Sequence, residues 1–584
     1  MGLISFLLST SYFRLFLYIA VQLALGYSRG FREFMIHKIH IPVMGICYTA
    51  DTPIRVAHLG ITSVISLVDD GLLEEYRMAY AERLGLDLGS PQTTRIGRIR
   101  SYLDFVADEV ERKFTRLCAE RIDGGSDKDL YFLMLPLDSR LRVEYDGVFA
   151  KTGLSRIAAE AALTEKMQPG EIQANIMVGL NHDEAAFDAV RGFAASKVKG
   201  ALVLSAGVNL AVFEEIAKCK DFYRTRDRAP SKKIILKVSD YRSALVQGRY
   251  LAKKGLEVYE YRIESGVNCG GHAFFESGKL LLDVVREFVE KRRELFETTR
   301  GMIEKTGNVP PSAPARITAQ GGLCTPEDIE TVMSLGIDGV GVGTPFLLVP
   351  QATSMDKATR RMLAAAAPKD VYVSHASPLG IPFVNLRTST AAELCRKKVE
   401  EFFAPETEKS GASELKPGFP CRQHYLCQKV PGFDHPVCRA SREYVMQRLA
   451  EIDKLEKEEL CTRKSIVSYD SCSEIRQKYD ALRRETLERE CICRFLGNAG
   501  REELREKNPS LYYQPECVAV ARGSQPARVR EPVTICPNSD IGYFDREYTL
   551  FEMMRHLYGT GPRLTPKDKP SAFEVEAEIL AKTV

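Results

Sequence analysis

The sequence contains no tryptophan and shows no strong excess of either charge. Its 584 residues include 81 lysine and arginine residues and 78 aspartate and glutamate residues, so the formal net charge is only +3. Nucleic-acid-binding proteins usually carry a clear basic excess, and this balance therefore predicts no nucleic-acid partner. The apolar and charged fractions, 45% and 27%, are typical of globular proteins, and the length predicts two or more domains. No function follows from the missing tryptophan.

Long apolar runs are missing except at the N-terminus, where residues 2–27 are nearly all apolar. The nearby basic residues are Arg14 within this run and Arg29, Arg32 and Lys38 after it. About 20 apolar residues span a bilayer, so residues 1–34 are interpreted either as an anchor that holds a cytoplasmic protein on the inner face of the membrane or as an over-extended gene start before Met35. A cleaved secretory signal fits less well because no basic residue precedes the run.

Cysteine pairs with the spacing of known metal motifs are also missing. Six cysteines are scattered over the first 400 residues, as expected of reduced thiols in a cytosolic protein. Nine more lie between Cys421 and Cys536, without the Cys-x2–4-Cys pairs of zinc ribbons or the tight spacings of ferredoxins. Their density still predicts an iron–sulfur cluster or zinc site that uses three or four of Cys421, Cys427, Cys438, Cys491 and Cys493. His424 and His435 would complete a zinc site, and structural thiols without metal are the alternative.

From about residue 40, short β-branched runs alternate with helical patterns. The eight runs are Ile41–Ile46, Ser63–Val68, Ile172–Val178, Ala201–Ser205, Ile234–Val238, Glu257–Glu264, Ala315–Ala319 and Asp338–Val342. They are continuous apolar stretches, as in strands buried on both faces. The clearest helix start has Thr325 as its capping residue and Pro326 in the first position. This pattern predicts a (β/α)₈ TIM barrel, with a doubly wound open sheet as the alternative.

Two long connections interrupt the barrel pattern. A largely helical insertion at about residues 70–170 follows the second run, and Lys279–Lys305 predicts a long charged helix after the sixth. Loops that follow barrel strands lie at the catalytic end, so both would cover a substrate pocket, with packing or oligomerisation as the alternative.

A shift to Pro, Gly, Ser and charge around residues 404–420 predicts a linker. We therefore expect a barrel domain over residues 35–404 and a cysteine-rich extension over residues 405–584. The extension is predicted to be mostly helical, including Arg442–Leu460 and Ser473–Arg489.

Two glycine-rich turns carry the strongest functional signal. The turn Ala319–Leu323 (AQGGL) begins at the last residue of the seventh run. The turn Gly341–Phe346 (GVGTPF) begins near the end of the eighth run and continues past it. Backbone amides approach a phosphate closely only where no Cβ intervenes, and the loops after strands seven and eight are the usual phosphate site of barrels. The two turns together predict a phosphate site, and tight turns without a ligand are the alternative.

The stretch ITAQGGLCTPEDIETVMSLGIDGVGVGTPFL resembles the FMN-phosphate region of the nitronate monooxygenase (2-nitropropane dioxygenase) family, which is related to the flavin-type enoyl-acyl-carrier-protein reductases. DVYVSHASPLGIPFVNLRTS is similar to the segment that follows the barrel in that family. The resemblance covers roughly residues 40–390. It implies that Gly321, Gly322, Gly343 and Thr344 hold the FMN phosphate.

The stretch ESGVNCGGH at residues 264–272 resembles the family's Glu-Ala-Gly-Gly-His motif. The resemblance implies that His272 faces the flavin as the catalytic base, with Gly270 and Gly271 beside the cofactor. An imidazole that titrates near neutrality can take the α-proton of a nitroalkane or return one to a reduced product. Asn268 and Cys269 stand where the family usually has Glu-Ala.

Four further residues are predicted to border the flavin. The first run is similar to the family's Pro-Ile-x-x-Ala-Pro-Met opening, which implies this position for Met44 and Gly45. Asn175 and Lys237 lie on the third and fifth runs. An Asn there would hydrogen-bond the isoalloxazine edge, and a lysine near N1 would stabilise the anionic reduced flavin. Structural roles for both polar residues are the alternative.

Together the residues and the resemblance predict an FMN-dependent oxidoreductase of the nitronate monooxygenase type, which oxidises a small molecule and is reoxidised by oxygen. One alternative is an NAD(P)H-dependent FMN reductase of the enoyl-thioester or quinone type, fed by an iron–sulfur cluster in the extension. No Rossmann fingerprint is present to separate the two. Another alternative is a flavin- or metal-binding sensor without catalysis. A homo-oligomer is compatible with each.

Overall fold

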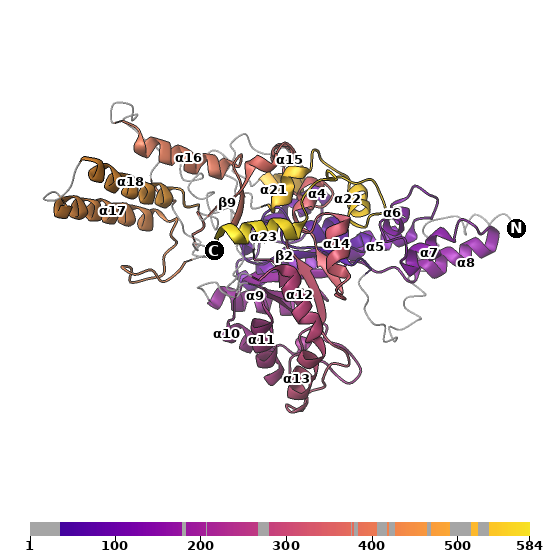
Figure 1. Ribbon diagram of the computed structural model, residues 1–584. Helices are drawn as coiled ribbons and strands as arrows, with labels where there is room; N and C mark the ends of the chain where they lie inside the picture. Colours follow the sequence, from indigo (N-terminus) through magenta and orange to yellow (C-terminus); the bar gives the residue numbers. More distant parts are fainter. Residues whose placement is uncertain are drawn as a thin grey trace.

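The computed structural model describes part of the chain, and every structural statement below refers to that part. The described residues are 36–177, 183–205, 207–266, 279–374, 376–378, 383–405, 417–419, 427–463, 469–490, 516–523 and 537–583. In Figure 1 the barrel occupies the middle of an elongated molecule, with helices extending from it on opposite sides.

Eight parallel strands close into a barrel in their sequence order, with β1 paired to both β2 and β8. The strands are β1 Ile39–Ile41, β2 Thr62–Ser66, β3 Ile172–Met177, β4 Ala201–Ser205, β5 Lys233–Val238, β6 Glu260–Glu264, β7 Arg316–Gln320 and β8 Gly339–Gly341. The predicted TIM barrel is confirmed, because a closed sheet excludes the doubly wound alternative.

The first strand lies earlier in the sequence than predicted. The structure places β1 at Ile39–Ile41, so the expected strand Ile41–Ile46 was wrong beyond its first residue. Pro42 has no amide hydrogen for the strand ladder, and Gly45 adopts a φ of +121°, which an extended strand does not allow. The apolar residues after Pro42 therefore form the loop at the carboxyl end of β1.

Helices surround the barrel between the strands. They are α3 Thr52–Val56, η1 Ala57–Leu59, α9 Asp183–Ala195, α10 Leu210–Ala217, η2 Lys220–Phe222, α11 Tyr241–Lys253, α12 Leu281–Glu290, α13 Arg292–Glu304, α14 Pro326–Met333, η3 Thr344–Leu348 and α15 Lys357–Ala364. The predicted single helix over Lys279–Lys305 is two helices that meet at Lys291. The predicted cap of α14 is confirmed, because the Thr325 side chain accepts a hydrogen bond from the amide of Asp328.

The insertion after β2 is helical, as predicted. It comprises α4 Asp70–Leu84, α5 Arg95–Ala119, α6 Asp127–Leu133, α7 Arg140–Asp146 and α8 Gly153–Thr164. The insertion reaches both ends of the barrel. Tyr76 of α4 donates a hydrogen bond to the Cys47 carbonyl in the loop after β1, whereas Tyr131 of α6 donates to the Gln168 carbonyl before β3. Helix α5 also reaches the mouth, because Tyr102 donates to the Ala50 carbonyl in the same loop, whereas Figure 1 shows α6, α7 and α8 together at one end of the molecule.

The chain after the barrel adds a small sheet and several helices. These are η4 Pro368–Asp370, the antiparallel pair β9 Val371–Ser374 and β10 Phe383–Leu386, then α16 Thr390–Phe403, α17 Arg442–Arg463, α18 Tyr469–Leu487, α21 Glu516–Arg522, η5 Ser539–Tyr543, α22 Leu550–Leu557 and α23 Ala572–Thr583. Helices α17 and α18 pair at the end opposite to α6–α8 (Figure 1). Their contact contains a small core of Ile452, Ile475 and Tyr479.

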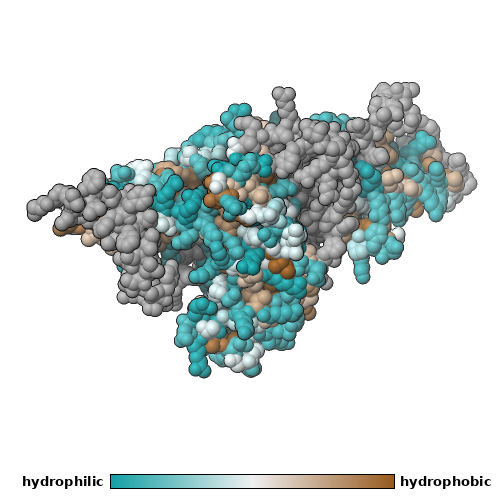
Figure 2. Space-filling view, turned by 180° about the vertical axis from the view of Figure 1, so that it is seen from behind, coloured by the Kyte–Doolittle hydropathy of each residue, from teal (hydrophilic) through white to brown (hydrophobic). Residues whose placement is uncertain are grey.

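The main hydrophobic core lies between the strands and the surrounding helices. It also includes Ile541, Phe544 and Leu557, so the end of the chain packs against the barrel rather than standing apart from it. A separate small cluster of Val64, Ala201, Val203 and Ile235 fills part of the barrel interior. The face seen in Figure 2 is mainly hydrophilic where described residues form it. Within the described ranges, no helix combines the length and the hydrophobicity that a membrane span requires.

Candidate functional site

The barrel interior is strongly polar on the side of β6 and β7. Arg262 and Glu260 form a buried ion pair, with 2.7 Å between Nη2 and Oε1. The Thr318 hydroxyl donates to the same carboxylate at 2.6 Å, and Arg262 also donates to Oε1 of Gln173 at 2.9 Å. Hydrogen bonds and opposite charge therefore stabilise two ionised groups inside the barrel, where an unpaired charge would be costly.

Polar side chains continue to the mouth of the barrel. Lys237 on β5 pairs with Glu264 at the end of β6, with 2.9 Å between Nζ and Oε1. The Gln320 amide donates to the same carboxylate oxygen at 3.0 Å, while its own Oε1 is buried without a hydrogen-bond partner among the described residues. Asn175 is in register with Val203 of the interior cluster, which places it on the inner face of β3.

A histidine lies in the interior beside this group. His40 of β1 is fully buried, and neither ring nitrogen has a hydrogen-bond partner in the described part of the chain. Burial, followed by the charge of Arg262, holds the pKa of His40 well below its usual range, so the ring is neutral at pH 7. A Cβ on Gly341 would lie 2.8 Å from His40 Nε2 and 2.9 Å from Gln320 Oε1. Glycine is therefore required in β8 for both side chains to occupy this space.

The two glycine turns lie where the sequence predicts them. Gly321 and Gly322 follow β7 with φ values of +135° and +73°, and a Cβ on Gly321 would lie 2.4 Å from the Ser265 Cβ. Gly343 follows β8, and a Cβ there would lie 3.5 Å from Cγ of Met44. The structure thus brings the loop that contains Met44 and Gly45 next to the second glycine turn.

Residues 537–583 contact the second glycine turn and the helix α14 that follows the first. The hydroxyl of Thr344 accepts a hydrogen bond from the Asn538 amide at 3.0 Å. The carboxylate of Asp328, at the start of α14, accepts one from the Ala572 amide at 3.0 Å. The segment 537–583 is therefore part of the walls around the predicted phosphate site, and the Thr344 hydroxyl already has a protein partner.

Glu576 of α23 binds residues on either side of the segment 267–278, in which the predicted base His272 lies. Its Oε1 accepts from the Ser265 hydroxyl at 2.7 Å, and its Oε2 accepts from the Leu281 amide at 2.9 Å. The side chain is buried, and burial raises its pKa. Ser265 and Leu281 flank residues 267–278, and the predicted Gly270, Gly271 and His272 lie in that interval, outside the described residues.

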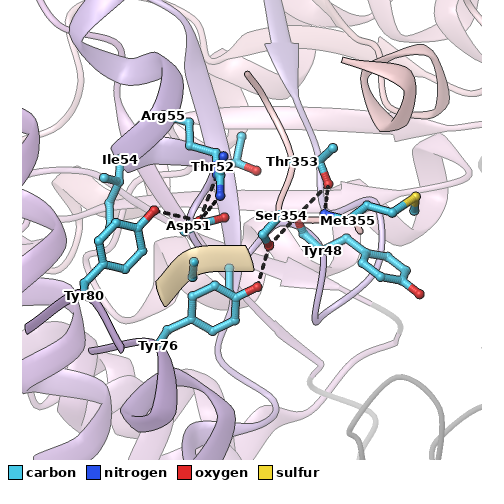
Figure 3. A network of polar contacts seen from close by, with 12 residues as sticks. Tyr48, Asp51, Thr52, Ile54, Arg55, Tyr76, Tyr80, Thr353, Ser354 and Met355 are labelled. Carbon is cyan, nitrogen blue, oxygen red and sulfur yellow. Dashed lines mark hydrogen bonds and ion pairs between the residues drawn. The ribbon is translucent and has the colours of Figure 1, made fainter. Parts of the chain in front are cut away.

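The loop after β1 is fixed by the insertion. Figure 3 shows Tyr80 of α4 pointing toward Asp51 and Tyr76 of the same helix pointing toward Ser354. Tyr80 donates to Oδ2 of Asp51 at 2.7 Å, and the same oxygen accepts from Nε of Arg55 at 2.8 Å. On the other side, the Thr353 hydroxyl donates to the Tyr48 carbonyl at 2.9 Å. These buried hydrogen bonds hold the loop that presents Met44 to the mouth.

The structure describes two of the five cysteines predicted to bind metal. Cys427 and Cys438 lie in a small cluster that also contains Cys395 of α16, which the sequence analysis had placed among scattered thiols. Cys421, Cys491, Cys493 and His424 lie outside the described residues. His435 is half exposed and faces the carboxylates of Asp434 and Glu443. The described residues contain no group of three or more metal-ligating side chains in a suitable arrangement, so the metal site stays a prediction.

Sequence analysis missed several polar groups at the mouth. Glu264 and Gln320 belong to the motifs that led to the prediction, but no role was assigned to them. Side chains of a strand alternate between its two faces, so the interior position of Arg262 implies the same face for Glu264. Glu576 gave no sequence signal, because it lies more than 300 residues from Ser265 along the chain.

Comparison with known proteins gives likenesses in structure alone. No protein-family model matches the chain, and no curated protein matches it. The fold is similar to the enoyl reductase domain of MlnA from the macrolactin biosynthesis cluster of Bacillus amyloliquefaciens, at 12% identity over 94% of this chain and 95% of that chain, with a TM-score of 0.43. It is also similar to FabK from Thermotoga maritima, at 18% identity over 43% of this chain and 64% of that chain, with a TM-score of 0.27. A nitroalkane oxidase from Streptomyces ansochromogenes is similar at 10% identity over 60% of this chain and 76% of that chain, with a TM-score of 0.30. Likenesses this distant do not assign a function.

Proposed function

We propose that the protein is an FMN-dependent oxidoreductase. The observation that carries the proposal is the pair of glycine turns at the carboxyl ends of β7 and β8, beside a mouth lined by Lys237, Glu264 and Gln320. Barrels bind phosphate at these two loops, and an isoalloxazine ring requires polar partners at its edge.

The residues present fit FMN. Gly322 at positive φ and Gly343 leave backbone amides open to a phosphate, and the unpartnered Oε1 of Gln320 is a hydrogen-bond acceptor buried at the mouth. Lys237 supplies a cation that would offset the negative charge of a reduced flavin. When bound, FMN supplies the electron-accepting chemistry, which these side chains do not have.

The proposed reaction is nitronate oxidation, with His272 as the base. His272 would remove the α-proton of a small nitroalkane to give the nitronate, and bound FMN would supply the electron-accepting chemistry, with oxygen as the terminal acceptor. A reductase fed by NAD(P)H is the second candidate, because the same histidine can return a proton to a reduced enoyl or quinone product. The two differ in their electron source, so nitronate-dependent oxygen consumption separates them from NAD(P)H oxidation.

An absorption spectrum of the anaerobically purified protein tests the cofactor. We expect flavin bands near about 370 and 450 nm, which arise from the cofactor's own electronic structure. Iron and zinc analysis of the same sample tests the cysteine prediction, and a broad iron–sulfur band would favour the reductase. Absence of flavin even after FMN is added would contradict the proposed function.

Gly343→Val tests the phosphate site. The new side chain would begin 3.3 Å from Cγ of Pro42 and 3.5 Å from Cγ of Met44, and it would block the approach of phosphate to the turn. The φ of Gly343 is negative, and the atom nearest to the new Cβ belongs to the Pro42 side chain rather than to the backbone, so circular dichroism of the variant checks that the barrel still forms. Bound FMN per protein should fall at least about tenfold, the equivalent of about 1.4 kcal/mol in binding.

The matched control is Gly301→Val in α13, where a Cβ would meet nothing within 4 Å. This variant should keep its FMN. A Gly343→Val protein that stays yellow, with an unchanged far-ultraviolet circular dichroism spectrum, would place the phosphate elsewhere.

A further inference from the structure

Helices α7 and α8 expose an unusual number of large apolar side chains. The apolar patch consists of Val143 of α7, Leu154 and Ile157 of α8, and Leu137 and Phe149 in the adjoining turns, all of them exposed, with Leu154 reaching 84%. Leu163 is the one buried side chain that the described part of α8 contributes to the core. Soluble proteins rarely expose a contiguous apolar surface without a partner.

The charges around the patch cancel. Residues 137–166 contain five basic and five acidic side chains. They pair mainly within one helix, for example Arg140 with Glu144 at 2.9 Å and Arg156 with Glu160 at 3.1 Å. A surface with paired charges and protruding apolar side chains fits a partner that is apolar and uncharged.

The apolar segment 2–27 joins the described chain beside this end of the molecule. Ile36 is the first described residue. Its side chain and that of Tyr131 in α6 both pack against Gly60, because a Cβ built on Gly60 would lie 3.2 Å from Cγ2 of Ile36 and 3.0 Å from Cε2 of Tyr131. Residues 28–35 can span at most about 28 Å when extended. Ile36, from which this segment leads away, therefore lies beside α6, and Figure 1 shows α6, α7 and α8 together at one end of the molecule.

The patch is too small to cover that segment. Helix α8 has 12 residues and is therefore about 18 Å long, whereas a helix of the length of segment 2–27 would measure about 39 Å. Docking the segment on the patch would leave most of it in water. A lipid bilayer accommodates both, because about 20 apolar residues match its hydrocarbon thickness and exposed Leu, Ile and Phe side chains partition into its interface.

We propose that the apolar patch of α7 and α8 is a membrane-contact surface, which rests on an uncharged bilayer while segment 2–27 inserts into it. This assignment does not depend on the proposed function. Because α6 packs at the amino-terminal ends of β2 and β3, the contact leaves the mouth of the barrel away from the lipid.

The absence of tryptophan from the sequence provides a direct test in the full-length protein. Ile157→Trp places the one tryptophan of the chain on the patch, and Val246→Trp places it on α11 at a similar exposure, 56% and 54% for the native side chains. With phosphatidylcholine vesicles, emission from the first variant should shift to shorter wavelength and be quenched by brominated lipid. Emission from the second should change little.

A charge substitution gives the second measurement. The double variant Leu154→Glu/Ile157→Glu should lower the vesicle partition coefficient at least about tenfold, because two large apolar side chains no longer enter the interface. Val246→Glu should change it less than about twofold, since its site faces water. Both sites are exposed, so circular dichroism should show an intact fold.

Three results would overturn the proposal. If Ile157→Trp binds vesicles without a change in its tryptophan emission, segment 2–27 alone would account for the binding. A reporter that is already shifted in buffer, with no vesicle binding, would mean that the chain itself or a second copy covers the patch, and light scattering distinguishes these two. Equal partitioning of the double variant and the native protein would exclude a contribution from α8.

Discussion

Replacing His272 with alanine should lower turnover by about 100- to 10,000-fold while bound FMN stays unchanged, because general acid–base groups typically contribute this much. The flavin phosphate and ring are assigned to other residues, so the cofactor should remain. Turnover is measured with a neutral nitroalkane and oxygen, because a nitronate has already lost the α-proton, and separately with NAD(P)H and an enoyl thioester, against flavin content determined from absorbance.

The control for this variant is His435→Ala, since His435 is half exposed and faces Asp434 and Glu443 in the extension. It should keep full turnover. If His272→Ala also retains full turnover with both substrate classes, the histidine is not the base, and a protein that binds flavin without catalysis becomes the better account.

Replacing Glu260 with alanine should reduce the free energy of unfolding by about 3–5 kcal/mol, because removing one partner of a buried ion pair leaves an uncompensated charge. Arg262 would remain inside the barrel, where it also donates a hydrogen bond to Gln173. Urea unfolding followed by circular dichroism measures the loss. A change below about 1 kcal/mol would show that water or a rearrangement replaces the carboxylate.

The double variant Glu260→Leu/Arg262→Met is the control, and it should lose much less stability than the single variant because neither charge of the pair stays buried. The effect should also depend on pH. Burial opposes ionisation of Glu260, but Arg262 and Arg316 outweigh it and hold its pKa below the ordinary value of 4.5. The stabilisation is therefore complete above about pH 4.5 and disappears as the pH falls further, so the difference between native and variant protein should shrink in acid.

The barrel could be predicted because parallel strands buried on both faces leave a clear pattern. Each of the eight apolar runs overlaps a strand, and the runs at β4 and β5 agree with the structure to within one residue. The error at β1 arose because the run continues through Pro42, and apolar character alone does not distinguish a strand from a buried loop. The break at Lys291 was missed because the charged pattern continues through it.

The candidate site was predictable only where short motifs carry it. Gly321, Gly322 and Gly343 could be recognised from the sequence, because a backbone that must approach a phosphate closely has no room for a Cβ and therefore requires glycine. The pairing of Lys237 with Glu264 follows from the parallel pairing of β5 with β6, which sets the ends of the two strands side by side. The contacts of Asn538 and Ala572 with the barrel loops depend on how the distant end of the chain packs, and no local pattern encodes that.

The position of Glu576 has a consequence for the synthesis of the protein. Ribosomes deliver a chain from its N-terminus, so the barrel strands are complete long before α23 emerges. A chain that stops before residue 572 keeps all eight strands and both glycine turns, yet it has no carboxylate to join Ser265 to Leu281 across the His272 segment. Any product that terminates before α23 would therefore carry the barrel without this link between the end of β6 and the start of α12.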